Sequence, residues 1–146
     1  MKVERLTDTE TFHLEIPADE NNLGEVRDFI SDVCARAGFS NRETSNTKLA
    51  VDEACTNIIK HAYGGASDRT ITITVSDNPE KFTVRLRDFG VKADSATFLP
   101  RDLADIQPGR LGMHFIRQVF DAVTYDTSHR QGTELILEKR KQQVPV

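Results

Sequence analysis

The sequence of 146 residues lacks the features that mark several large classes of protein. It contains no apolar run near the roughly 20 residues that a membrane-spanning helix needs. Its polar start, MKVERLTDTE, has no signal-peptide core. Acidic residues outnumber basic ones by 23 to 19, and no dense Lys/Arg cluster is present. We therefore expect neither a membrane nor nucleic acid as a partner.

Cysteine is also scarce, since Cys34 and Cys55 are the only two. Both fall on predicted apolar helix faces, which favours buried thiols in a reducing compartment over a disulfide or a metal-binding pair. A chain of this length can build a core without disulfide or metal support. We expect one cytoplasmic domain over residues 1–146.

Apolar residues recur in regular patterns along the chain. Alternation predicts five strands, at residues 11–16, 71–75, 82–86, 123–127 and 133–139. Helical spacing predicts three helices, at residues 23–37, 44–62 and 112–121. The hairpin-type connections predict an α+β fold, a two-layer sandwich with a mixed, mostly antiparallel sheet covered on one face by helices. The patternless stretch 89–109 is longer than most connections, so we expect it to be disordered or functional.

Three polar residues interrupt the second half of the long predicted helix, VDEACTNIIKHAYGG. Glu53, Asn57 and His61 recur every fourth residue along one border of the apolar face. A border position is half-buried, so a ligand at the edge of the layers could reach it. Solvated residues at the rim of an amphipathic helix would show the same spacing, and this stretch alone leaves both interpretations open.

Two polar residues share the inward side of predicted strands. Every second residue of a strand points to the same side of the sheet. Asp88 therefore points the same way as Val84 and Leu86, and Thr133 the same way as Leu135. An inward carboxylate is costly unless something donates to it. The donor could be a backbone N–H of the following turn or a bound ligand. Thr133 could be a structural strand residue.

The segment PGRLGMHFI, residues 108–116, places Gly109 and Gly112 around the predicted start of a helix. Free N–H groups there could bind an anion such as phosphate, and Arg110 would add a positive charge. A plain flexible loop would give the same pattern.

Together, E-x-x-x-N on a helix, D-x-G after a strand, G-x-x-G before a helix and G-T before the last strand resemble the GHKL-type ATPases. That superfamily includes gyrase, the heat-shock chaperone and the histidine kinases. AVDEACTNIIKHAYGG and GRLGMHFIRQVFDAVTYD look most like its stand-alone anti-sigma-factor serine kinases. The resemblance runs from the first strand to about Lys139. It implies one histidine-kinase-like ATPase domain that uses ATP and Mg²⁺, with an ATP lid at about 91–108.

The resemblance also assigns roles to individual residues. Glu53 matches the general base, and Asn57 the Mg²⁺ ligand. Asp88 matches the acceptor for the adenine amine, Gly90 the glycine that lets the backbone approach the base, and Thr133 the hydroxyl near adenine. The segment around the phosphates matches Gly109, Arg110, Leu111, Gly112 and Met113.

Three further positions qualify the match. His61 corresponds to a histidine common in the subfamily and is a candidate nucleotide contact without an assigned role. The complete form of the D-x-G motif in this superfamily would read D-x-G-x-G, but in this sequence Lys92 occupies the position of the second glycine. The stand-alone kinases often show D-x-G-x-x-x-D instead, and Asp94 fits that form, so we include it among the nucleotide-binding candidates.

The resemblance implies a kinase that phosphorylates a Ser/Thr on a STAS-type anti-anti-sigma factor and also binds a sigma factor or another target. A homodimer is expected, through the first strand and the outer helix surface. The main alternative is a nucleotide-responsive module that sequesters a partner with little or no kinase activity. An interaction domain without nucleotide is a third hypothesis. A histidine kinase is disfavoured, because no helical hairpin for a phosphoacceptor histidine precedes the domain.

Overall fold

The computed structural model describes residues 2–6, 8–92 and 108–141. The predicted Asp94 and most of the predicted lid lie outside these residues. The strands are β1 (Lys2–Leu6), β2 (Thr9–Pro17), β3 (Thr70–Asp77), β4 (Lys81–Arg87), β5 (Ala122–Asp126) and β6 (Glu134–Arg140). The helices are α1 (Leu23–Arg36), α2 (Asn41–Asn57) and α3 (Pro108–Val119), with a 3-10 turn at Glu20–Asn22 and a π-helical turn at Ile58–Ala62.

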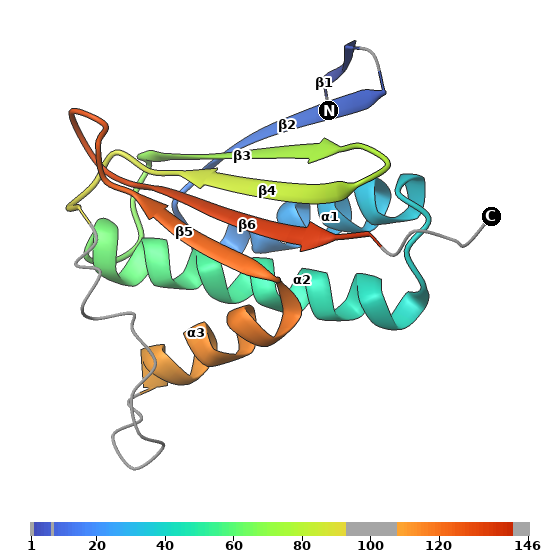
Figure 1. Cartoon of the computed structure of the whole chain (residues 1–146). Helices are drawn as coiled ribbons and strands as arrows, with labels where there is room; N and C mark the ends of the chain where they lie inside the picture. The colour runs from blue at the N-terminus through green and yellow to red at the C-terminus, as the bar shows by residue number, and fades with distance from the viewer. Residues whose placement is uncertain (1, 7, 93–107, 142–146) are drawn as a thin grey trace.

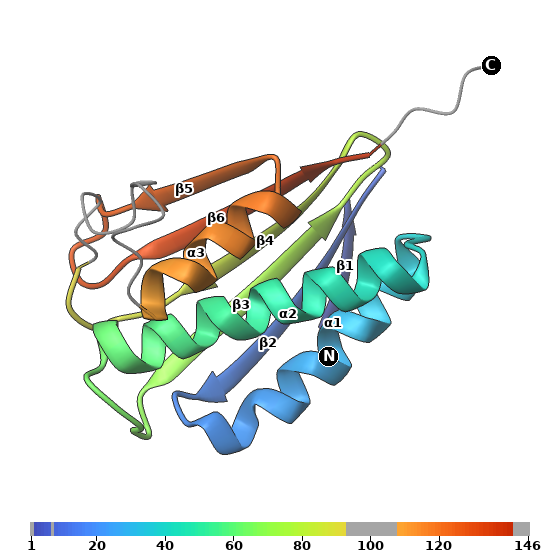
Figure 2. The ribbon, with the colours of Figure 1, turned by 90° about the horizontal axis from the view of Figure 1, so that it is seen from below.

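One six-stranded sheet forms the first layer, in the order β1-β2-β3-β4-β6-β5. Every neighbouring pair is antiparallel. The three α-helices lie on a single face of this sheet, with α2 in the middle (Figures 1 and 2). The predicted two-layer α+β sandwich is confirmed, and its sheet is antiparallel at all five pairings. The described residues include no helix that is long and apolar enough to cross a membrane.

Strand β1 was not predicted. In KVERL the apolar residues Val3 and Leu6 are three positions apart, so the segment shows no alternation. It joins the sheet through its pairing with β2, and backbone ladders of that kind leave no signature in the side-chain pattern.

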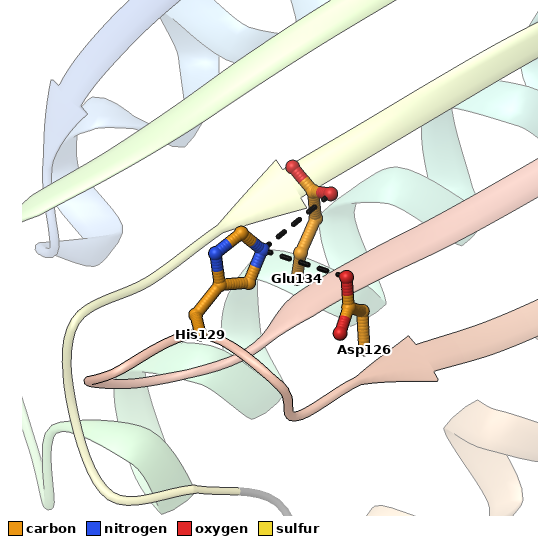
Figure 3. A group of neighbouring side chains, drawn as sticks. All are labelled: Asp126, His129 and Glu134. Carbon is orange, nitrogen blue, oxygen red and sulfur yellow. Dashed lines mark ion pairs between the residues drawn. The ribbon is translucent and has the colours of Figure 1, made fainter.

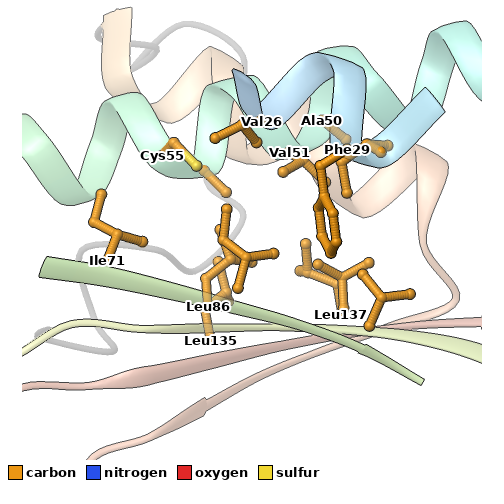
Figure 4. Close-up of a cluster of buried hydrophobic side chains, with 14 of the residues drawn as sticks. Val26, Phe29, Ala50, Val51, Cys55, Ile71, Leu86, Leu135 and Leu137 are labelled. Carbon is orange, nitrogen blue, oxygen red and sulfur yellow. The ribbon is translucent and has the colours of Figure 1, made fainter. Parts of the chain in front are cut away.

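The sheet register aligns the inward residues of four strands in rows. One row runs through the paired residues Leu14, Ile73, Leu86 and Leu135. The next row runs through Phe12, Val75, Val84 and Leu137. These rows pack against α1 and α2 in the core (Figure 4). The predicted inward faces of the strands are therefore correct.

Helix α2 begins at a complete capping box. The Ser40 hydroxyl accepts from the Glu43 N–H at 3.1 Å, and the Glu43 carboxylate accepts from the Ser40 N–H at 3.1 Å. The predicted helix over 44–62 does end at Ala62, but its last turn, Ile58–Ala62, is π-helical, because α-helical pairing stops at Asn57. The Tyr63 N–H then donates to the Ile58 carbonyl at 3.1 Å, which is the i→i−5 bond of a π turn.

Helix α3 begins four residues before its predicted start, at Pro108 instead of Gly112. Proline suits a first helical position, because it has no N–H to leave unpaired. Gly112 therefore lies inside the helix, where its N–H belongs to the helical ladder. The prediction of a free N–H on Gly112 is wrong, and that glycine needs another explanation.

Both cysteines are buried free thiols, as the sequence predicts. Burial raises the pKa of each thiol to about 12. The thiolate that reacts with oxidants and metals is therefore suppressed at neutral pH.

Candidate active site

Three segments meet at one end of the molecule, on the left of Figure 1: the C-terminal end of α2, the turn that follows β4, and the β5–β6 hairpin. Two backbone hydrogen bonds join these segments. The Asp88 N–H donates to the Thr133 carbonyl at 3.0 Å, and the Val91 N–H donates to the Ala62 carbonyl at 2.8 Å. Residues predicted from separate motifs are thus brought together.

Asp88 is the buried carboxylate of this region, with 4% of its surface exposed. Its side chain accepts from the Gly90 N–H at 3.0 Å, so the turn partner considered from the sequence is present. Burial raises the pKa of Asp88, and backbone hydrogen bonds from Gly90 and Thr133 oppose that rise. An ionised carboxylate has about four acceptor positions, so these contacts leave capacity for a ligand donor. Thr133 is also inward and 3% exposed, as predicted.

Two glycines allow the backbone segments to touch around Asp88. A Cβ on Gly90 would lie 2.1 Å from the Ala62 carbonyl oxygen, and a Cβ on Gly132 would lie 2.1 Å from the Asp88 carbonyl oxygen. Gly132 also has a φ of +77°, in the left-handed region. The predicted role of Gly90 is a close approach to a nucleotide base. In the structure, the space of its absent side chain faces the end of the π turn.

Replacing Gly132 by Ala should lower the free energy of unfolding by about 2–4 kcal/mol, because backbone atoms of Asp88 and Phe89 block the methyl group and φ is unfavourable. Urea unfolding measures this change. Gly38→Ala is the matched control, since Gly38 has a φ of +81° but nothing within 4 Å of its Cβ position. Gly38→Ala should cost only about 1–2 kcal/mol. Equal losses in the two variants would contradict the packing role of Gly132.

A group of side chains that no sequence motif predicted holds the turn after β4. The Tyr63 hydroxyl donates to the Thr70 carbonyl at 2.6 Å and accepts from the Phe89 N–H at 2.8 Å. The Arg69 guanidinium lies 4.6 Å from the centre of the Tyr63 ring and donates to the Phe89 carbonyl. Tyr63 lies two residues after His61 and directly before Gly64 and Gly65, where a turn does not require an aromatic residue. That position was the available signal.

Glu53 lies on α2 where α3 crosses it. A Cβ on Gly112 would lie 2.4 Å from Glu53 Oε2 and 3.2 Å from its Cδ, so the carboxylate occupies the space of the absent side chain. Glu53 remains exposed to solvent. Gly112 therefore lets a helix pass close to the carboxylate and leaves that group accessible.

Asn57 lies one helical turn beyond Glu53 and is half-buried. Its Nδ2 atom is sealed from solvent without a hydrogen-bond partner in the described part of the chain. A 180° rotation of the amide would place its oxygen there instead, so one polar atom lacks a partner in either orientation. An unused polar atom at this position is consistent with a site for an ion or ligand.

The remaining predicted residues are placed as follows. His61 is exposed, within the π turn. Met113 is 3% exposed, and its sulfur accepts a hydrogen bond from the Tyr125 hydroxyl at 3.0 Å, so its side chain belongs to the core. Gly109, Arg110 and Leu111 form the first turn of α3.

The family model for the histidine kinase-like ATPase domain matches residues 16–139, which include every described element from the end of β2 to β6. The chain belongs to the histidine kinase-like ATPase family. Curated relatives agree over most of their length. The serine-protein kinase RsbW of Listeria monocytogenes (EGD-e) is 32% identical over 136 residues, covering 86% of this chain and 84% of the relative. RsbW of Bacillus subtilis (strain 168) is 28% identical over 123 residues, covering 75% and 74%.

These relatives confirm the predicted resemblance to the stand-alone anti-sigma-factor serine kinases, and with it the enzyme class, a protein serine/threonine kinase. A solved structure, the SiaB–SiaC complex from Pseudomonas aeruginosa, contains a chain of similar fold. The match has a TM-score of 0.59 at 14% identity and covers 89% of this chain and 88% of that one. At that identity the likeness supports the fold alone.

Proposed function

We propose that this chain binds Mg-ATP and transfers its γ-phosphate to a Ser/Thr of a STAS-type anti-anti-sigma factor, which controls release of a sigma factor or another target. The contact between Glu53 and Gly112 is the observation that carries this proposal. It places an accessible carboxylate beside α3, one helical turn from the unsatisfied Asn57 amide. The serine-protein kinase relatives support the reaction class.

Asp88, Gly90 and Thr133 would hold the adenine. A buried carboxylate with spare acceptor capacity favours a ligand that presents an N–H donor, as the exocyclic amine of adenine does. Thr133 lies directly before β6 and is also buried, and its carbonyl accepts from the Asp88 N–H. The contacts of Gly90, Gly132 and Tyr63 would keep the carboxylate in place before the nucleotide binds.

Asn57 would hold the metal through its side-chain oxygen. Mg²⁺ prefers oxygen ligands and keeps several waters, so one protein ligand together with phosphate oxygens suffices. The unpaired atom of Asn57 is Nδ2, a donor that does not bind Mg²⁺, so the amide would turn to present its oxygen to the ion. When bound, the ion neutralises phosphate charge. The first turn of α3, with Gly109, Arg110 and Leu111, has N–H groups without helical partners and would bind the phosphates.

Glu53 would accept the proton from the attacking hydroxyl. Phosphoryl transfer depends mainly on positioning and charge stabilisation, and a well-placed base adds to both. Because Glu53 is exposed, a serine or threonine of a protein acceptor can approach it. His61, Asp94 and Met113 stay in the proposal as nucleotide contacts without assigned chemistry, although the buried Met113 side chain favours a packing role.

A partner-sequestering module that responds to nucleotide but has little kinase activity is the alternative. An accessible carboxylate in the space left by Gly112 favours the kinase, because nucleotide-dependent sequestration alone does not need a base there. The anti-anti-sigma partner, a homodimer and a cytoplasmic location are further parts of the proposal. The buried free thiols are consistent with that location.

Isothermal titration of the purified chain with ATP tests the nucleotide part of the proposal. We expect saturable binding that EDTA weakens by about 10-fold or more, since the metal screens the phosphates. Absence of binding at millimolar ATP would refute the proposal.

Replacing Gly112 by Ala should lower phosphoryl transfer by about 10-fold or more, because the methyl group displaces the Glu53 carboxylate. Stability should be unchanged or higher by up to about 1 kcal/mol, since Ala is the better helix former and the exposed Glu53 side chain can rotate. Labelling of the acceptor and urea unfolding measure the two effects. Gly24→Ala on α1 is the control, because its Cβ would meet only Arg27 at 3.8 Å. Unchanged transfer in Gly112→Ala would contradict the assigned geometry.

A further inference from the structure

Outside the proposed active site, three potential metal ligands cluster at the tip of the β5–β6 hairpin (Figure 3). Asp126 ends β5 and pairs across the sheet with Glu134, which begins β6, and His129 lies in the connection between them. One ligand atom from each residue lies within 4.8 Å of the other two. Glu134 alternates with the inward Thr133 and Leu135, so this cluster lies on the sheet face opposite the helices.

The imidazole of His129 points between the two carboxylates (Figure 3). Its Nε2 lies 3.6 Å from Asp126 Oδ2 and 3.8 Å from Glu134 Oε1. Both separations are too long for a hydrogen bond. The Nε2 atom is nonetheless sealed from solvent, with no hydrogen-bond partner within the described residues. The two contacts are ion pairs when the imidazole is protonated. When it is neutral, Nε2 can present a lone pair between the two carboxylates, which is the arrangement that a metal ion needs.

Two of the separations are close to the edges of a metal polyhedron. Metal bonds of about 2.0–2.2 Å at tetrahedral angles set ligand atoms about 3.3–3.6 Å apart. The two distances from Nε2 are 3.6 and 3.8 Å, and the two carboxylate oxygens lie within 4.8 Å of each other, so the three side chains would close on a bound ion. One nitrogen and two carboxylate oxygens form a donor set that suits a borderline divalent ion such as Zn²⁺, with water in the fourth position. We propose that Asp126, His129 and Glu134 form a binding site for a divalent transition-metal ion, distinct from the magnesium position at Asn57.

One neighbouring residue orients a ligand of this site, and another competes with the metal for a ligand oxygen. The Ser128 N–H and hydroxyl donate to Asp126 Oδ1 at 2.9 and 2.5 Å, which leaves Oδ2 facing His129. Ordering of a ligating carboxylate by such outer hydrogen bonds is common at metal sites. Arg85 donates to Glu134 Oε1 at 3.2 Å and competes for that oxygen. A bound metal must displace this contact or use the second oxygen of Glu134.

The site would stabilise the hairpin that carries Gly132 and Thr133. Because the metal joins the last residue of β5 to the first residue of β6, it closes the connection whose Gly132 packs on the backbone of Asp88. A metal on the outer face of the sheet would thus strengthen a contact of the nucleotide-binding turn on the inner face.

Titration of the full chain with Zn²⁺ alone, without nucleotide, tests the inference by calorimetry. We expect one equivalent to bind, and we expect His129→Gln to weaken the affinity by about 10-fold or more. Two histidine variants serve as controls. His13→Gln alters an open-face residue that contacts Thr74, and His61→Gln removes the histidine four positions after Asn57. Both should bind Zn²⁺ as the native chain does. Arg85→Gln should tighten binding, since it removes the competing positive charge.

X-ray absorption of the zinc-loaded chain should show one imidazole nitrogen among oxygen ligands. Thermal unfolding without metal checks that His129→Gln is folded. The inference is overturned if the native chain binds no Zn²⁺ at 100-fold molar excess, or if folded His129→Gln binds as tightly as native. Loss of binding in His61→Gln with retention in His129→Gln would place the ion at the nucleotide site and also refute it. None of these outcomes depends on kinase activity.

Discussion

Replacing Glu53 by Gln should lower the rate of phosphoryl transfer to the acceptor by about 10²–10⁴-fold, the range that a positioned general base supplies. Glutamine keeps the size of the side chain beside Gly112 but cannot take a proton from the attacking hydroxyl. Binding of ATP and of the acceptor should change little, since the residue acts on the transferred proton. Single-turnover transfer, with the two binding constants measured separately, checks this result.

Asp32→Asn is the control for Glu53→Gln, because it removes a carboxylate from an exposed position on α1. Its transfer rate should equal that of the native chain. An unchanged rate of phosphoryl transfer in Glu53→Gln would mean that another residue is the base. A loss of ATP binding in the same variant would mean that Glu53 holds the nucleotide and is not primarily a base.

Replacing Asp88 by Asn should weaken ATP binding by about 10- to 150-fold, the effect of losing a hydrogen bond of about 1.5–3 kcal/mol to a charged acceptor. Asparagine can still accept from the Gly90 N–H and fits the same space. Its amide, however, can present a donor to the adenine amine. Calorimetric titration with Mg-ATP measures the loss. Asp68→Asn, at an exposed position between α2 and β3, should bind ATP normally.

The same variant should retain or gain stability, and the sign follows from the raised pKa of Asp88. The folded chain binds a proton at Asp88 more readily than the unfolded chain does. Stability therefore declines as pH rises from the unfolded pKa through the folded one, and the deficit remains at higher pH. Asp88→Asn removes this dependence. Full ATP affinity in a folded Asp88→Asn variant would contradict the adenine assignment.

Strand parity predicted the inward positions of Asp88 and Thr133, because a period of two fixes the face of every strand residue once the apolar set is known. The helical period likewise predicted that Cys34 and Cys55 are buried. These predictions succeeded because burial of apolar side chains determines them. The family resemblance then connected motifs whose separate interpretations the residues had left open.

Features set by backbone contacts between distant segments were not predictable in the same way. The π turn at Ile58–Ala62 has the composition of an ordinary helix, and its carbonyl at Ala62 is used by Val91. Gly112 was assigned to a helix start, yet its lack of a side chain is explained by Glu53 on another helix. The roles of Gly132 and Tyr63 come from their contacts with the backbone of Asp88 and Phe89, which are distant in the sequence. No local pattern encodes such contacts.

Transfer of labelled phosphate from γ-³²P-ATP to a STAS-type anti-anti-sigma factor of the same organism tests the central claim most directly. The account predicts label on a serine or threonine of the acceptor, dependent on Mg²⁺ and abolished by EDTA. An acceptor that binds this chain in the presence of Mg-ATP but stays unlabelled would contradict the kinase proposal and favour nucleotide-controlled sequestration.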